Sequence, residues 1–221
     1  MAWRANPVKS PRVLAQSGVP IILLPAGNWT NVTGAMTLGT PLPYKPTGAV
    51  WVYLFASGIA AAGLYLATFS SVTDLQLVDL PSTVVGAYTP ALTQIVLATV
   101  NVPGGSMGPN GAIRWDFSIS YTNSASAKSF VLTFGGIYIL GINGTATNSA
   151  RAVGLLRNRG ADNVQLQSGT TLSIGTGNTG TSAAQASVNT KVDAPVRFAA
   201  QLAATTDYII FDGYTIELLP S

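Results

Sequence analysis

The sequence contains no histidine and no cysteine among its 221 residues. The chain therefore lacks the commonest general base, the usual ligands of transition metals and all thiol chemistry. Acidic residues number only eight, so an active site would have to be built from few carboxylates together with hydroxyl, Tyr and Lys side chains. We therefore expect a protein that is not an enzyme and that binds no metal or other cofactor.

Charge of either sign is also scarce. Charged residues make up 9% of the chain and hydrophobic residues 48%, whereas about a quarter of a typical soluble domain is charged. This composition is typical of a protein that packs against other copies of itself. The 23 glycines and 13 prolines favour many turns and few helices, and the length allows one large β domain or two small ones.

The small excess of positive charge comes from the N-terminus. Arg4, Lys9 and Arg12 precede every acidic residue, and the eight remaining cations balance the eight acids, which leaves the net charge of +3. Two prolines disfavour a helix in this stretch, so residues 1–17 are predicted to form an extended arm. The arm is either a solvated tail or a strap that anchors the protein to an acidic surface of a larger assembly. Three charges are too few to indicate nucleic-acid binding.

One long uncharged stretch needs an interpretation. No charge occurs between Lys45 and Asp74, and residues 48–67 reach the ~20 residues that a membrane-spanning helix requires. The same residues also fit two buried strands, Val50–Phe55 and Leu64–Phe69, joined by small residues. Because cations do not cluster beside either end of the stretch, we favour the two strands over a membrane span.

The clearest structural signal lies in Gly111–Tyr121. Large apolar residues alternate there with Arg114, Asp116, Ser118 and Ser120 over nine positions. Successive side chains of a strand point to opposite faces, so this period of two predicts a strand with one dry and one solvated face. The alternating apolar residues are Ile113, Trp115, Phe117, Ile119 and Tyr121.

The remaining pattern predicts an all-β protein in two parts. A small N-terminal β domain is expected over residues 18–81, with a first strand over 19–24, followed by a linker over 82–91. Residues 92–221 are expected to form a jelly-roll β-sandwich, because about eight strands alternate there with turn clusters. The predicted strands are Ile95–Val102, Ala112–Tyr121, Ser129–Phe134, Ile137–Leu140, Arg151–Asn158, Asn163–Gln167, Val196–Leu202 and Tyr208–Leu219.

Three local patterns could carry function. Gly175–Gly180 matches a Gly-x-Gly-x-x-Gly phosphate loop, but the residues after it have no apolar stripe to support the helix that such a loop requires; residues 169–187 are predicted to be an exposed loop instead. Asp212-Gly213, where the apolar phase of the last strand shifts, predicts either a β-bulge or a two-residue hairpin. Four aromatic residues fit either a sugar-stacking platform or the core: Trp29, Tyr44, Trp51 and Tyr53.

Several segments carry a resemblance to a known family. They are Gly-Pro-Asn-Gly-Ala-Ile-Arg (108–114), Tyr-Thr-Asn-Ser-Ala-Ser-Ala-Lys-Ser-Phe-Val-Leu-Thr-Phe-Gly-Gly (121–136) and Ala-Thr-Thr-Asp-Tyr-Ile-Ile-Phe-Asp-Gly-Tyr-Thr-Ile-Glu-Leu (204–218), with 17–21 and 62–71 upstream. Together they resemble a family of short tailed-bacteriophage virion proteins. The resemblance implies a two-part β architecture that ends in a jelly roll, is usually trimeric, and is displayed as a tail fibre, a spike or a capsid decoration.

The expected function follows from this resemblance together with the arm. We expect a homotrimeric tail fibre or spike, assembled in the bacterial host cytoplasm into the virion and anchored by Arg4, Lys9 and Arg12 to a tail adaptor, a portal-proximal protein or the capsid surface. A distal loop containing Gly175, Asn178 and Thr179 would contact a glycan or a protein of the host surface. The alternative is a capsid decoration protein that stabilises the head. A sugar-cleaving enzyme would need facing carboxylates, for which Asp207 and Asp212 are the candidates.

Overall fold

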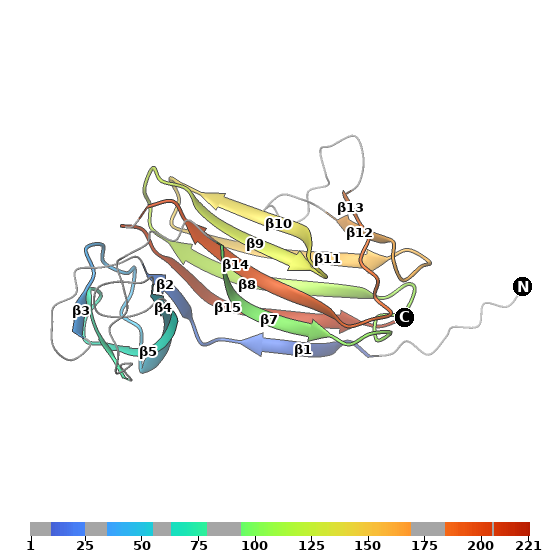
Figure 1. Ribbon diagram of the computed structural model, residues 1–221, viewed down its shortest axis with the longest axis horizontal. Coiled ribbons are helices and arrows are strands. Elements are labelled where there is room, and N and C mark those ends of the chain that lie inside the picture. The colour runs from blue at the N-terminus through green and yellow to red at the C-terminus, as the bar shows by residue number, and fades with distance from the viewer. Residues whose placement is uncertain (1–9, 25–34, 55–62, 79–93, 169–183, 205) are drawn as a thin grey trace, which may run out of the picture.

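The computed structural model describes residues 10–24, 35–54, 63–78, 94–168, 184–204 and 206–221, and the regular secondary structure in these ranges is entirely β (Figure 1). The strands are β1 (Arg12–Ser17), β2 (Ile21–Leu24), β3 (Ala35–Thr37), β4 (Ala49–Leu54), β5 (Gly63–Phe69), β6 (Asp74–Leu77), β7 (Ile95–Val102), β8 (Ala112–Tyr121), β9 (Lys128–Phe134), β10 (Ile137–Gly144), β11 (Ser149–Asn158), β12 (Gln165–Ser168), β13 (Ala184–Ala186), β14 (Ala194–Leu202) and β15 (Ile209–Leu219).

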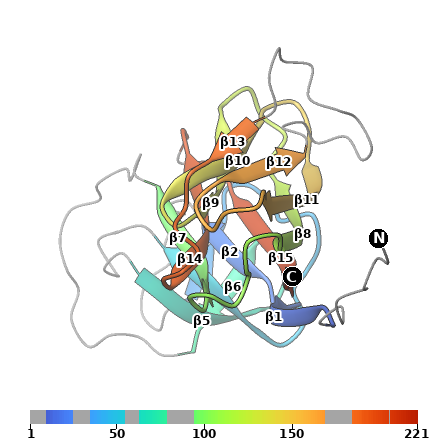
Figure 2. The same cartoon turned by 90° about the vertical axis from the view of Figure 1, so that its right-hand side faces the viewer.

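Two layers of strands face each other to form the sandwich (Figures 1 and 2). One layer has the order β1-β15-β8-β11 and the other β7-β14-β9-β10. The chain changes layer at most connections, from β7 to β8, from β8 to β9 and from β10 to β11, while β9 and β10 form a hairpin. Eight antiparallel strands in this order form a jelly roll, which agrees with the all-β sandwich expected from the sequence.

The eighth strand of the sandwich comes from the stretch that the sequence analysis assigned to the arm. Residues 12–17 form β1, which pairs antiparallel with β15 from Arg12 opposite Leu218 to Ser17 opposite Tyr214. Leu14 and Ala15 pack against the sandwich core. Only these two of the six side chains pack against the core. Because so short a pattern does not identify a strand from sequence, this pairing is seen only in the folded chain.

Between β1 and β7 the chain builds a smaller unit of five strands, in the order β2-β4-β5-β6-β3, and we refer to β2–β6 with their described connections as the small unit. It joins the sandwich edgewise through β2, where Ile21 pairs with Phe211 of β15. Since Ser17 pairs with Tyr214, β1 and β2 run along the same strand in one direction. The small unit therefore lies at one end of the sandwich (Figure 1).

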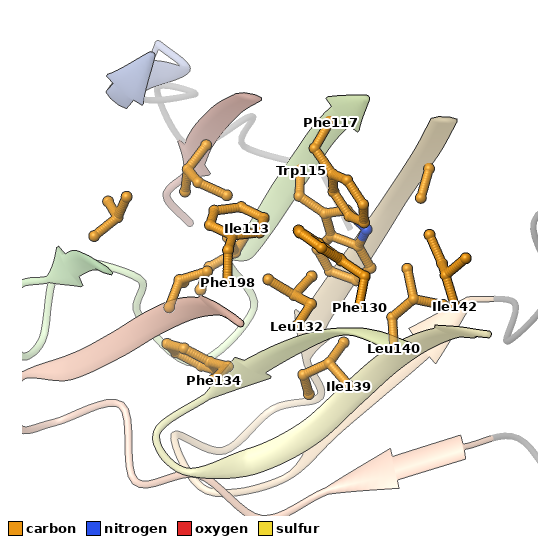
Figure 3. Close-up of a cluster of buried hydrophobic side chains, with 14 of the residues drawn as sticks. Ile113, Trp115, Phe117, Phe130, Leu132, Phe134, Ile139, Leu140, Ile142 and Phe198 are labelled. Carbon is orange, nitrogen blue, oxygen red and sulfur yellow. The ribbon is translucent and has the colours of Figure 1, made fainter. Parts of the chain in front are cut away.

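The core of the sandwich is centred on four phenylalanines, one from each of four strands. Phe117 and Phe130 have ring centroids 5.0 Å apart, and Phe198 and Phe211 have centroids 4.9 Å apart. Because β8 and β15 belong to one layer and β9 and β14 to the other, these contacts hold the two layers together. Figure 3 shows Phe117, Phe130 and Phe198 directed toward one another.

The small unit has a core of its own that is mostly aliphatic, and β2 and β15 contribute to both cores. Leu23 belongs to the sandwich core and Ile22 to the core of the small unit. Likewise, Phe211 faces the sandwich and Ile210 the small unit. Both strands are apolar without alternation at this point because each of their faces meets a different core.

The structure confirms several boundaries predicted from the sequence. β7 and β8 begin and end at the predicted residues. The register of β15 against β8 shifts between Phe211 and Gly213, so Asp212-Gly213 forms a β-bulge and not a hairpin. The uncharged stretch contains the antiparallel pair β4 and β5, and no helix in the described part of the chain is long and apolar enough to cross a membrane.

Candidate functional site

One row of paired residues places the base of the predicted arm and the borders of the predicted host-contact loop at the same end of the molecule. The row crosses β1, β15, β8, β11, β12 and β13, and its members are Arg12, Leu218, Ile113, Leu156, Gln167 and Ala184. Strands β12 and β13 border residues 169–183. The small unit lies at the opposite end (Figure 1).

A hydrogen-bonded cap joins the loops at this end of the sandwich. The buried side chain of Asn158 donates to the Gly108 carbonyl at 2.7 Å and to the Thr190 hydroxyl at 2.9 Å. Gln165, which is fully buried, donates to the Asn158 side-chain oxygen at 2.7 Å and bonds both backbone groups of Val188. Such satisfied buried amides hold loops from distant parts of the chain in one arrangement.

Exposed cations of three segments lie at the same end of the sandwich as this cap. Arg12 lies at the start of β1, Arg157 and Arg159 at the end of β11, and Lys191 on the connection between β13 and β14. In the described part of the chain, Arg12 and Arg159 form no ion pair, and Arg157 donates to the Asn110 carbonyl at 3.1 Å. We call this surface the basic end.

Three acidic residues lie near the basic end, and each already has a partner. Asp162 lies 3.7 Å from the ammonium of Lys191, and both residues line a cavity of about 510 Å³. Glu217 pairs with Arg114 at 2.6 Å. The Gly104 amide and the Asn101 side chain donate to Asp193, and these bonds lower the pKa of its carboxyl. The cations therefore outnumber the acids, and Arg4 and Lys9 precede this end in the sequence.

Of the residues predicted to anchor the protein or to contact the host, only Arg12 is described. Arg4, Lys9 and the residues proposed for host contact, Gly175, Asn178 and Thr179, lie outside the described ranges, as does the Gly-x-Gly-x-x-Gly segment. Arg157, Arg159 and Lys191 were not anticipated. The close spacing of Arg157 and Arg159 beside a turn glycine was a local signal for them, whereas their proximity to the arm depends on strand pairing.

A second feature is a groove on the outer face of the layer β1-β15-β8-β11, where β15 bulges. It has a volume of about 330 Å³ and is lined by Gln16, Ser17, Asp116, Phe117, Ser118, Arg151, Asp212, Gly213, Tyr214 and Thr215. At its rim, Asp212 accepts hydrogen bonds from Ser120 at 2.8 Å and from the hydroxyl of Tyr44 at 3.1 Å. Burial raises the pKa of Asp212, and the pKa of Tyr44 rises to about 12 because of its own burial and the neighbouring carboxylate.

The two carboxylates considered for sugar cleavage have separate partners. Asp207 is almost fully buried and lies 3.5 Å from the ammonium of Lys128, with the hydroxyl of Ser124 donating to it at 2.8 Å. Asp212 instead bonds Ser120 and Tyr44 at the groove. In the described residues, no group of three Asp or Glu side chains could hold a metal ion.

The aromatic residues also separate. Trp51 lies on the outward face of β4 with 42% of its surface exposed, and Tyr53 on the same face packs against the sandwich core. The hydroxyl of Tyr44 donates a hydrogen bond to Asp212 at the groove, and Trp29 lies outside the described residues. The three described residues therefore have separate surroundings and do not form the sugar platform considered from the sequence.

Comparisons with known proteins give weak similarities only. No family model matches the sequence, and no curated protein is significantly similar to it. Among solved structures, the CBM2 module of the evolved Dit of Lactobacillus casei BL23 phage J-1 is similar over 96% of this chain and 97% of that module, with a TM-score of 0.35 and 12% identity. Dimeric latent PorU from Porphyromonas gingivalis is similar over 92% of this chain, with a TM-score of 0.32 and 13% identity, and this chain spans 21% of PorU. At these TM-scores the similarities do not define a shared fold.

Proposed function

We propose that the chain is a structural protein of a bacteriophage virion, anchored to the particle through its basic end. The proposal rests on one observation. Exposed cations from β1, β11 and the β13–β14 connection lie at the same end of the sandwich, where the predicted arm joins it at Arg12. A surface of this kind attracts an acidic partner and positions it. The resemblance of the sequence segments to phage virion proteins supports the choice of partner.

We propose a homotrimeric tail fibre or spike as the form in which the protein is displayed, with a decoration protein as the alternative. Self-association is supported by the outward face of β4 and β5, where Trp51 pairs with Leu66 and the exposed Leu64 lies opposite Tyr53. The described part of this face carries no charge, as is common in the buried cores of subunit interfaces. The molar mass in solution tests the trimer. The number of copies per particle separates a few fibres or spikes from an abundant decoration.

Anchoring is tested by two changes that leave the folded core intact. Deletion of residues 2–11 removes Arg4 and Lys9 but keeps β1, and Arg159→Glu reverses an exposed charge that has no partner among the described residues. Both variants should fold and assemble as the unaltered protein does but enter particles several-fold less often. Lys45→Glu, which reverses an exposed cation of the small unit between β3 and β4, is the matched control. Incorporation of both variants at the unaltered level would refute anchoring by this end.

The predicted host-contact loop needs a separate test because the strands that border it lie at the basic end. Deletion of residues 175–180, which include Asn178 and Thr179, should leave incorporation unchanged and reduce adsorption of particles to host cells if the loop contacts the host. Loss of incorporation would instead assign the loop to the anchoring surface, and host contact would then fall to the other end of the molecule.

A further inference from the structure

The groove over the β-bulge exists because a glycine occupies an outward position of β15. Gly213 pairs with Ser118 of β8, and on its other side β1 ends at Ser17. A Cβ added to Gly213 would lie 2.7 Å from the Ser17 carbonyl oxygen, which no side chain tolerates. The bulge therefore removes one side chain from the sheet surface and leaves a hollow whose lining residues come from β1, β8, β11 and β15.

Three neutral polar side chains line this hollow with unused hydrogen-bonding capacity. In the described part of the chain, Gln16, Ser118 and Thr215 form no side-chain hydrogen bond. Gln16 and Thr215 are paired across β1 and β15, and Ser118 lies two residues beyond Asp116, the partner of Thr215 on β8. An amide and two hydroxyls offer both donors and acceptors to a ligand.

The charged groups at the groove are held by fixed partners. Arg151 donates to both oxygens of Asp116, with 2.9 Å between its Nε and one of them. Asp212 is bound by Ser120 and Tyr44. The charges of Arg151 and Asp116 cancel, and Asp212 is the remaining carboxylate. The groove therefore carries no excess of positive charge and does not favour an anion.

An aromatic ring stands at the rim. Tyr44, from the segment before β4, lies beside the groove: its hydroxyl donates to the lining residue Asp212, and 40% of its surface is exposed. The ring of Tyr44 can pack against the apolar face of a ligand, because a tyrosine combines an apolar face with a polar tip. The side chains of Gln16, Ser118 and Thr215 can then form hydrogen bonds with the polar edges of the ligand. The volume of about 330 Å³ lies at the lower end of the range for small-molecule sites.

We infer that this groove binds a short neutral saccharide through Gln16, Ser118 and Thr215, with Tyr44 packing against the sugar. A polyhydroxylated, uncharged ligand matches adjacent hydroxyl, amide and carboxylate groups beside one aromatic ring. The inference goes beyond the proposed virion role and does not require it, because sugar binding is measured on the purified chain and incorporation is measured on particles.

The test uses the full chain labelled with ¹⁵N and titrated separately with cellotriose, maltotriose, chitotriose and, as an anionic comparison, sialyllactose. At least one neutral trisaccharide should shift the amide signals of Gly213, Ser118 and Gln16 at millimolar concentration. Thr215→Val removes one hydroxyl at nearly constant shape and should weaken binding by up to about tenfold, the equivalent of one hydrogen bond.

The matched control is Thr99→Val, which removes an exposed hydroxyl from β7 in the other sheet and should leave the affinity unchanged. Gln16→Leu provides a second variant on a different strand, so that a folding defect in one variant does not decide the outcome. The inference is overturned if no neutral trisaccharide shifts the groove amides, if sialyllactose binds more tightly than all of them, or if Thr215→Val and Gln16→Leu bind as the unaltered chain does.

Discussion

The sandwich and the small unit are stabilised in different ways although they share one sheet. The sandwich encloses an aromatic core between two layers, and buried polar side chains stabilise its ends: Asn158 with Gln165, and Lys128 with Asp207. The small unit encloses a mainly aliphatic core with one sheet, and its described residues carry only the charges of Lys45 and Asp74. Its core is completed by Tyr208 and Ile210 at β15. The small unit therefore depends on the sandwich to close its core.

The largest effect is expected from the centre of the sandwich. Phe117→Ala removes a ring that contacts Phe130, Phe198 and Phe211 and should lower the free energy of unfolding by about 3–5 kcal/mol. The small unit should lose its structure with the sandwich, because β15 forms a wall of both cores. Urea unfolding followed by tryptophan fluorescence and by far-UV circular dichroism checks both points. A small unit that persists after the sandwich unfolds would break the proposed dependence.

A comparable loss in the free energy of unfolding is expected from breaking the buried ion pair of Lys128 and Asp207. Lys128→Met leaves the carboxylate of Asp207 buried with, among the described residues, only the hydroxyl of Ser124 as a side-chain partner and should cost about 3–5 kcal/mol. The double variant Lys128→Met/Asp207→Leu removes both charges and should recover most of this loss. Thermal unfolding of the two variants measures the difference, and equal stability of the single and double variants would contradict an uncompensated charge as the cause.

The small unit should respond locally to a cavity of its own. Leu54→Ala in β4, a fully buried position, should cost about 2–5 kcal/mol and speed amide exchange in β4 and β5. Exchange in β9 and β14, which do not touch this core, should change little. Hydrogen exchange followed by mass spectrometry checks the distribution, and equal acceleration in both regions would show that the two cores unfold as one.

The smallest effect concerns pH and distinguishes two carboxylates on the outer face of the sandwich. Hydrogen bonds from Arg151 lower the pKa of Asp116, so its contribution to stability is present above the ordinary pKa of 3.8 and is lost as the pH falls through the lowered value. Burial raises the pKa of Asp212, so its contribution is present below 3.8 and is lost as the pH rises through the raised value.

Substitution of each carboxylate should therefore change the pH dependence in opposite ways. Asp116→Asn should flatten the loss of stability in acid, and Asp212→Asn should flatten the loss that accompanies the rise toward neutral pH. Urea unfolding across this pH range, compared with the unaltered protein, measures both slopes. A change of the same sign in the two variants would contradict the assigned pKa directions.

The sequence predicted the parts of the fold where one face is dry and the other solvated. In β8, Trp115 and Phe117 alternate with Asp116 and Ser118, and the strand begins and ends where predicted. The break in phase at Gly213 likewise predicted the bulge. Periodicity was sufficient in these places because each side chain contacts only one environment.

Other elements depend on pairing that no local pattern records. Residues 12–17 contain only two side chains that reach the core, and their role as a strand comes from the pairing with β15. The basic end was only partly foreseen for the same reason. Arg12 and Arg159 are far apart in the chain. The pairing of β1 with β15, of β15 with β8 and of β8 with β11 brings them to the same end of the sandwich.

The antiparallel pairing of β1 with β15 has a mechanical consequence. The hydrogen bonds of such a pair lie perpendicular to the strands, and β1 continues toward the small unit along the same partner. Tension applied to the chain ahead of Arg12 and directed along β1 would load these bonds together in shear. An attachment made at this point would resist a pull as a set of parallel bonds and would not peel open one bond at a time.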